Sequence, residues 1–267
     1  TGVQTCALPI LVFATSHIGA VFLPINYRLS ADEVGYIVGN SGARLLVADE
    51  EFAAIVTGGA PVVLLGEVAQ SSVTNLAPDI APAPIHVRQP RDLMRLMYTS
   101  GTTDRPKGVM LSHGNLLAMS LCYLADVDQA TPNDASLYAA PISHGAGLYN
   151  FPHVRMGGRH VVPETGGFDP DEVLNLGRQL DNVVMFAAPT MVRRLVDAAR
   201  KRGENGEGLR TIIYGGGPMY TVDIRDAMAT MGPRFVQIYG QGESPMTITA
   251  LSRSEERRVG KECRSRW

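Results

Sequence analysis

The chain has 267 residues and a formal net charge of −2 at pH 7; 45% of its residues are hydrophobic and 19% are charged. This near-neutral balance gives no argument for binding to nucleic acid or to an anionic membrane. No apolar run reaches the roughly 18 residues that a membrane span needs, and the N-terminus lacks the basic region of a secretory signal. We therefore expect a cytoplasmic globular protein with one large domain or two small ones.

The two ends of the chain differ from the rest. Residues 1–10 (TGVQTCALPI) and 253–267 (RSEERRVGKECRSRW) resemble open-frame translations of sequencing adapters, and neither continues the pattern of its neighbour. We expect both to lie outside the fold, although Arg253 could also be the last native residue. The remaining residues, 11–252, are then an incomplete piece of a longer domain. Their single cysteine, Cys122, makes no disulfide or zinc site and is expected to be a small buried side chain.

Short elements alternate in the first part of this piece. Apolar runs predict strands at residues 20–25, 44–48 and 61–65. A helical pattern covers residues 30–40, where Ser30 at the N-cap and Glu33 three residues later form a capping-box sequence. The proline-rich stretch 77–84 then predicts a linker or surface loop.

A more regular alternation follows. Strands are predicted at residues 93–98, 135–140, 159–162, 183–187, 209–214 and 235–239. Helices are predicted at residues 115–125, 169–180, 191–201 and 221–231. In the second helix Asp169 can cap, Pro170 takes the first helical position and Glu172 completes a capping box. The alternation predicts an α/β fold with wound, mostly parallel sheets and flanking helices, whose ligands lie beyond the carboxyl ends of strands.

Residues 98–108 (YTSGTTDRPKG) directly follow a predicted strand. Glycines allow backbone N–H groups to approach an anion, hydroxyl groups add donors, and Lys107 adds a positive charge, which together suit a polyphosphate. The segment is not a Walker A loop, because that pattern needs glycine and serine or threonine where this chain has Pro106 and Gly108. The alternative interpretation is a surface turn without a ligand.

Three further glycine-rich segments also follow predicted strands: residues 141–147 (PISHGAG), 214–218 (YGGGP) and 239–243 (YGQGE). Taken alone, His144 could be a structural histidine and Glu243 a solvated surface acid. Their positions between glycines at strand ends favour a functional role instead. With phosphate chemistry already indicated, Glu243 is predicted to bind Mg²⁺.

These four segments, in this order, resemble those of the adenylate-forming superfamily, which includes acyl-CoA synthetases, luciferases and the adenylation domains of peptide synthetases. The resemblance continues through residues 109–115 (VMLSHGN) and spans essentially residues 11–252. It implies catalytic roles for Lys107, His144 and Glu243, with Glu243 also the metal ligand. It implies that the nucleotide is bound by Thr99, Ser100, Gly101, Thr102, Thr103, Lys107, Gly108, Gly215, Gly216, Gly217, Pro218, Tyr239, Gly240, Gln241 and Gly242.

One position departs from the family pattern. The residue before the glutamate is usually a threonine whose hydroxyl helps to hold phosphate, and here it is Gly242. The resemblance nevertheless implies a ligase that activates a fatty or aromatic carboxylic acid with ATP and Mg²⁺ to an acyl-AMP and transfers it to coenzyme A. The alternatives are delivery to a carrier-protein thiol, or a nucleotide-binding fragment without turnover. Family members are considerably longer and carry an essential lysine in a C-terminal domain, so the isolated chain is expected to be inactive.

Overall fold

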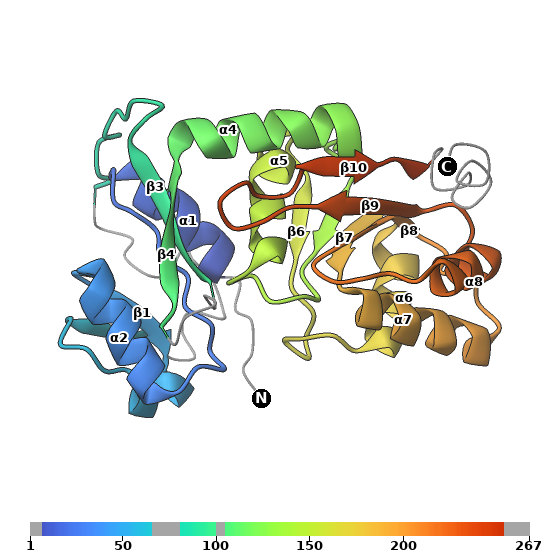
Figure 1. Ribbon diagram of the computed structural model, residues 1–267, viewed down its shortest axis with the longest axis horizontal. Coiled ribbons are helices and arrows are strands. Elements are labelled where there is room, and N and C mark those ends of the chain that lie inside the picture. Colours follow the sequence, from blue (N-terminus) through green and yellow to red (C-terminus); the bar gives the residue numbers. More distant parts are fainter. Residues whose placement is uncertain (1–6, 66–80, 100–104, 254–267) are drawn as a thin grey trace, which may run out of the picture. The chain divides into compact units, whose positions relative to one another are not determined.

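The computed structural model describes residues 7–65, 81–99 and 105–253 (Figure 1). The chain divides into two compact units, Thr1–Gly114 and Asn115–Trp267, each with its own internal contacts. In the described part of the chain, no helix has both the length and the hydrophobicity to cross a bilayer. The predicted linker at 77–84 falls partly outside this part; its described residues, 81–84, are exposed and have no regular structure.

In its described residues, the first unit contains three helices and two separate pairs of strands. The helices are α1 (Ala7–His17), α2 (Ala31–Ser41) and the 3₁₀ turn η1 (Glu50–Ile55). Strands β1 (Leu46–Asp49) and β2 (Val62–Leu65) pair in parallel. Strands β3 (Leu93–Thr99) and β4 (Lys107–Ser112) form an antiparallel hairpin.

The capping box predicted for α2 is confirmed. The Ser30 hydroxyl accepts a hydrogen bond from the Glu33 backbone at 3.3 Å, and the Ser30 backbone N–H donates to the Glu33 carboxylate at 2.8 Å. These two bonds satisfy N–H groups that have no partner inside the helix. The Ser30 backbone N–H, together with the Ser30 hydroxyl, which donates to the Glu33 carboxylate at 2.9 Å, lowers the pKa of Glu33. The helix then buries one face through Val34, Ile37 and Val38.

The predicted boundaries of the adapter-like ends do not coincide with boundaries of structural elements. Helix α1 begins at Ala7, so four of residues 1–10 are helical, and Pro9 is buried. Residues 8–14 of this helix are all apolar, and a proline is tolerated in a first turn because its missing N–H breaks no helical bond. At the other end, Arg253 donates a hydrogen bond to Asp128 at 3.1 Å. The rest of both end segments lies outside the described residues, and their origin stays a prediction.

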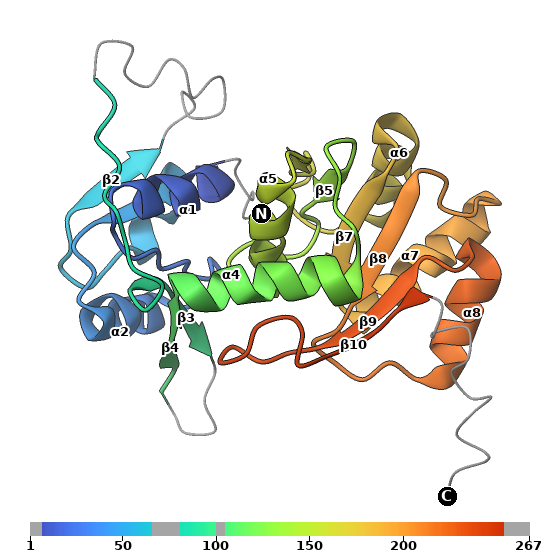
Figure 2. The ribbon, with the colours of Figure 1, turned by 90° about the horizontal axis from the view of Figure 1, so that it is seen from above.

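The second unit is built on a six-stranded sheet in the order β10-β9-β8-β7-β5-β6. Its strands are β5 (Ala135–Leu137), β6 (Arg159–Val161), β7 (Val183–Ala187), β8 (Leu209–Tyr214), β9 (Phe235–Tyr239) and β10 (Thr249–Leu251). All neighbours are parallel except β10 and β9. Figure 2 shows β5, β7 and β8 running side by side. The predicted α/β class with a mostly parallel sheet is confirmed.

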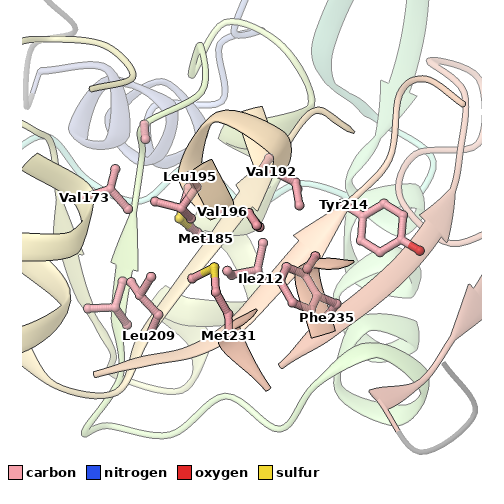
Figure 3. Packing of buried hydrophobic residues seen from close by; sticks show 14 of the residues in the cluster. Val173, Met185, Val192, Leu195, Val196, Leu209, Ile212, Tyr214, Met231 and Phe235 are labelled. Atoms are coloured by element: carbon pink, nitrogen blue, oxygen red, sulfur yellow. The ribbon is translucent and has the colours of Figure 1, made fainter. Parts of the chain in front are cut away.

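The described helices and turns of the second unit are α4 (His113–Cys122, which begins in the first unit), the π-helical turn η3 (Tyr123–Val127), the 3₁₀ turn η4 (Gly145–Tyr149), α5 (Asn150–Arg155), α6 (Pro170–Leu180), α7 (Pro189–Arg202) and α8 (Thr221–Met231). Of these, α6, α7 and α8 contribute buried side chains to the core of the sheet. Figure 3 shows the core beneath α6, α7 and α8, formed by Val173, Leu195 and Met231 with Met185, Ile212 and Phe235 of the strands. Burial of these apolar side chains holds the carboxyl ends of the strands in register.

The start of α6 follows the prediction only in part. Asp169 accepts a hydrogen bond from the Glu172 backbone at 2.9 Å, and Pro170 takes the first position of the helix. The Glu172 carboxylate does not return to the N-cap; it accepts a hydrogen bond from the Glu164 backbone at 2.6 Å. Its bond to the preceding loop replaces the second half of the predicted capping box.

Other predictions were wrong. Residues 20–25 form no strand and make only an isolated bridge between Phe22 and Arg95. Cys122 is exposed rather than buried, because it lies on the outer side of the last turn of α4. The turn η4, helix α5 and strand β10 were not predicted, since each is too short to show a clear hydrophobic period.

Candidate functional site

Three of the four glycine-rich segments lie at one end of the large sheet. Residues 141–147 follow β5, residues 214–218 follow β8, and residues 239–243 follow β9. These strands belong to one sheet and run parallel through β7. Their carboxyl ends therefore meet, and that is where parallel α/β sheets bind ligands.

The segment after β5 presents His144 on a tight turn. The His144 side chain is exposed, whereas the preceding Ser143 is buried, with its hydroxyl oxygen 3.0 Å from His144 Nδ1. The His144 carbonyl accepts a hydrogen bond from the Gly147 backbone at 3.1 Å. A Cβ atom on Gly147 would overlap the carbonyl oxygen of Ile142, so this position must be glycine for the turn to form. The turn thus fixes the backbone from which the imidazole projects.

The segment after β8 is a glycine turn, residues 214–218. Tyr214 is buried, while residues 216–218 are exposed. A Cβ atom on Gly215 would lie 2.7 Å from the Ile238 carbonyl oxygen, so the approach of β9 requires glycine here. Gly216 has φ +76°, which L-residues with side chains rarely adopt. The result is an exposed backbone, free of side chains, at the end of a buried strand.

The segment after β9 folds back on itself. The Tyr239 side chain is 52% exposed, and its hydroxyl accepts a hydrogen bond from Gln241 Nε2 at 2.8 Å. The Tyr239 carbonyl accepts from the Ile248 backbone at 2.8 Å, which closes the loop. A Cβ atom on Gly240 would lie 2.6 Å from the Met246 carbonyl oxygen, so the loop closes only around a glycine. Glu243 is exposed on this loop.

The fourth segment lies in the first unit, in the β3–β4 hairpin. Thr99 ends β3 and pairs with Lys107 at the start of β4. Five residues of the predicted phosphate loop lie outside the described residues: Ser100, Gly101, Thr102, Thr103 and Asp104. Lys107 and Gly108 are exposed, and a Cβ atom on Gly108 would lie 3.1 Å from Cζ of Tyr98. The start of β4 thus presents an exposed lysine opposite the end of β3.

The described residues form no complete metal centre at this end of the sheet. Within the described ranges, no cluster of three or more His, Cys, Asp or Glu side chains could hold a metal ion. Mg²⁺ usually binds through one or two carboxylates together with phosphate oxygens and water molecules. A single exposed carboxylate such as Glu243 fits that mode of binding.

An aromatic row lies behind the glycine turn and was missed in the sequence. We define the aromatic row as Phe186, Tyr149, Tyr123 and His153, which come from β7, η4, η3 and α5. The Phe186 and Tyr149 rings stack at 5.6 Å, and the Tyr149 and Tyr123 rings meet edge to face at 5.7 Å. The Tyr123 hydroxyl lies 3.3 Å from Nε2 of His153.

Burial perturbs every titratable member of the aromatic row. Burial raises the pKa of both tyrosines well above 10 and lowers the pKa of His153 to about 4. These side chains are therefore neutral near pH 7. Tyr149 and His153 lie in η4 and α5, two elements that were not predicted, whereas Tyr123 lies within the predicted helix at residues 115–125, whose period does not show its ring contacts.

Known proteins resemble this chain over most of its length. The family model for AMP-binding enzymes matches residues 3–264. The feruloyl-CoA synthase of Amycolatopsis sp is 34% identical over 249 residues, covering 91% of this chain and 48% of the relative. The fatty acid–acyl-carrier-protein ligase ScoC of Streptomyces coeruleorubidus is 30% identical over 251 residues, covering 90% and 47%.

Solved structures of other proteins resemble the fold of this chain. The ATP-bound structure of MatB from Rhodopseudomonas palustris superposes with a TM-score of 0.77 at 31% identity, covering 92% of this chain and 50% of that protein. The chain therefore spans about half the length of the relatives that it matches.

Proposed function

We propose that this chain, which belongs to the AMP-binding enzyme family, is part of an enzyme that activates a carboxylic acid with ATP and passes the acyl group to coenzyme A. The observation that carries the proposal is the meeting of His144, the glycine turn and the Tyr239–Glu243 loop at the carboxyl end of one parallel sheet. The resemblance to a feruloyl-CoA synthase supports the choice of reaction.

In this proposal the nucleotide is held mainly by backbone and by one ring. The exposed glycine turn and the Gly240–Gly242 segment let adenosine approach the backbone closely. The half-exposed ring of Tyr239 offers a flat apolar face for adenine. The phosphates are bound by the segment that begins at Thr99 and ends at Gly108, in which Lys107 supplies positive charge.

The Glu243 carboxylate would hold Mg²⁺, which would offset the negative charge of the phosphates. His144 orients the substrate carboxylate, because its imidazole projects from a backbone fixed by the Gly147 turn. The exposed position of both side chains leaves them accessible to a ligand.

The chemistry follows from the poor leaving group of a carboxylate. One carboxylate oxygen attacks the α-phosphorus of ATP, and the bond to pyrophosphate breaks, so that the acyl carbon gains AMP as a leaving group. A thiolate sulfur then attacks the acyl carbonyl, and AMP leaves as the thioester forms. The protein contributes position and charge neutralisation rather than covalent bonds.

A carrier-protein thiol is the second candidate acceptor. It is favoured by the resemblance to ScoC, which the chain matches almost as completely as it matches the feruloyl-CoA synthase. The two candidates share the first half-reaction and differ only in the thiol.

The test uses the parent protein, completed with the coding sequence on both sides of residues 11–252. With Mg²⁺-ATP and a panel of carboxylic acids, we expect acid-dependent pyrophosphate release, followed by a thioester when coenzyme A is added. Thioester formation only with a phosphopantetheinyl carrier protein would select the second acceptor. ATP binding without pyrophosphate release for any acid would overturn the proposed function. Sequencing the flanking genomic DNA tests in addition our proposal that residues 1–10 and 253–267 derive from adapters.

A further inference from the structure

The first member of the aromatic row lies against the glycine turn. Phe186 is the penultimate residue of β7, the strand between β5 and β8. Cζ of its ring lies 4.0 Å from the position that a Cβ atom on Gly216 would take. The ring is only half-buried, unlike the other residues of β7. Phe186 therefore forms an apolar surface at the same end of the sheet as His144 and the glycine turn.

The space behind this surface is occupied. Tyr149 stacks on Phe186 with an angle of 28° between the rings, and only 3% of Tyr149 is exposed. Its hydroxyl is buried and has no hydrogen-bond partner among the described residues. Tyr123, which is fully buried, closes the row beyond it. The row thus extends from the sheet end into the interior as rigid aromatic side chains.

Two physical consequences follow for a substrate whose carboxylate lies beside His144. A planar ring placed against Phe186 gains an aromatic pair in addition to apolar burial, which is worth about threefold to tenfold in binding. A long alkyl chain gains only burial, and it would have to displace Tyr149 and Tyr123 to extend inward. Close-packed interiors resist such displacement.

We propose that Phe186 and Tyr149 select a compact aryl acid over a long-chain fatty acid. This inference rests on the proposed function, because it assumes that the acid is activated beside His144. The partly exposed Phe186 ring makes the contact, and Tyr149 holds that ring from behind while limiting the depth available to the acid.

The experiment compares substrates on the parent protein. Pyrophosphate release is measured with benzoate, 4-hydroxycinnamate and dodecanoate, and we expect kcat/KM for the better aryl acid to exceed that for dodecanoate by about tenfold or more. Phe186→Leu should lower kcat/KM for the aryl acid by about threefold to tenfold and leave that for dodecanoate within about twofold. Tyr149→Leu should raise the dodecanoate-to-aryl ratio, because it removes a ring that blocks depth.

Phe235→Leu is the matched control. Phe235 is a buried phenylalanine of β9 that belongs to the main core and not to the aromatic row. Phe235→Leu also removes a phenyl ring from this sheet, and it should keep the wild-type ratio of kcat/KM for dodecanoate to that for the aryl acid. Preference for dodecanoate in the wild type, or an equal change of ratio in the control, would overturn this inference alone. Absence of pyrophosphate release with all acids would overturn the proposed function itself.

Discussion

Acidification should destabilise the region around His153 by a predictable amount. The His153 side chain is fully buried, and burial lowers its pKa from an ordinary value of 6.5 to about 4. The neighbouring His160 and Arg210 lower this pKa further, and Asp134 opposes them. At about 1.4 kcal/mol per pH unit, the difference between the folded and unfolded pKa corresponds to about 3 kcal/mol.

The sign follows from which state binds the proton. Above pH 6.5 the imidazole is neutral in both states and contributes no pH dependence. Between pH 6.5 and pH 4 the unfolded chain binds a proton that the folded chain excludes, so the free energy of unfolding falls as pH falls. Below pH 4 the folded form is also protonated, and the loss of about 3 kcal/mol is complete.

Urea unfolding of the parent protein at pH 7, 5.5 and 4, followed by circular dichroism, measures this loss. His153→Gln removes the titrating group but keeps a side chain that can hydrogen-bond the Tyr123 hydroxyl. We expect its stability to fall by about 3 kcal/mol less than that of the wild type between pH 7 and pH 4. The exposed His86, replaced by Gln, is the control and should follow the wild type. Identical pH dependence in the wild type and His153→Gln would refute the reasoning.

Four further predictions concern the site and the chain. In the parent protein, Glu243→Gln should cripple pyrophosphate release while ATP binding survives better; unchanged turnover at limiting Mg²⁺ would exclude metal binding by Glu243. Lys107→Ala should slow adenylation more than thioester formation from preformed acyl-AMP, and equal losses in the two half-reactions would contradict its role. Gly240→Ala should lower the free energy of unfolding by about 1–3 kcal/mol because its Cβ meets the Met246 backbone, whereas Gly217→Ala, whose Cβ finds only ordinary contacts, should leave the melting temperature unchanged. The isolated 267-residue chain should make no detectable acyl-CoA, because it spans only about half the length of the relatives that it matches; robust synthesis would refute this.

Local sequence signals located much of the fold correctly. Strands Val183–Ala187, Leu209–Tyr214 and Phe235–Tyr239 have the predicted bounds, because each is a short, mostly apolar run that follows a turn. Helix α8 (Thr221–Met231) also matches, and α2 starts where the Ser30 capping box places it. In each case the information lies within a few residues of the element that it specifies.

The features of the fold that were not predicted depend on contacts between residues far apart in the sequence. Whether Cys122 is buried depends on what covers the end of α4, which its own sequence does not state. Strand β10 exists because it pairs with β9 after the loop from Tyr239 folds back. The stacking of Phe186 on Tyr149 joins a strand to a turn 37 positions earlier in the chain, and a helical or strand period cannot report such a contact.

The glycines that follow the strands made the site easy to find in the sequence, but a glycine can be required either by packing or by a ligand. Gly215 is required by the approach of Ile238, and Gly240 by the approach of Met246, whether or not a ligand binds. Their presence after strands is therefore accounted for by packing alone. Gly217 and Gly145 are different: a Cβ on Gly145 would meet nothing within 4 Å, and one on Gly217 would make only ordinary contacts. Among the described residues, packing therefore does not account for the glycines at these two exposed or half-buried positions; a ligand lying against the bare backbone is our proposal for them.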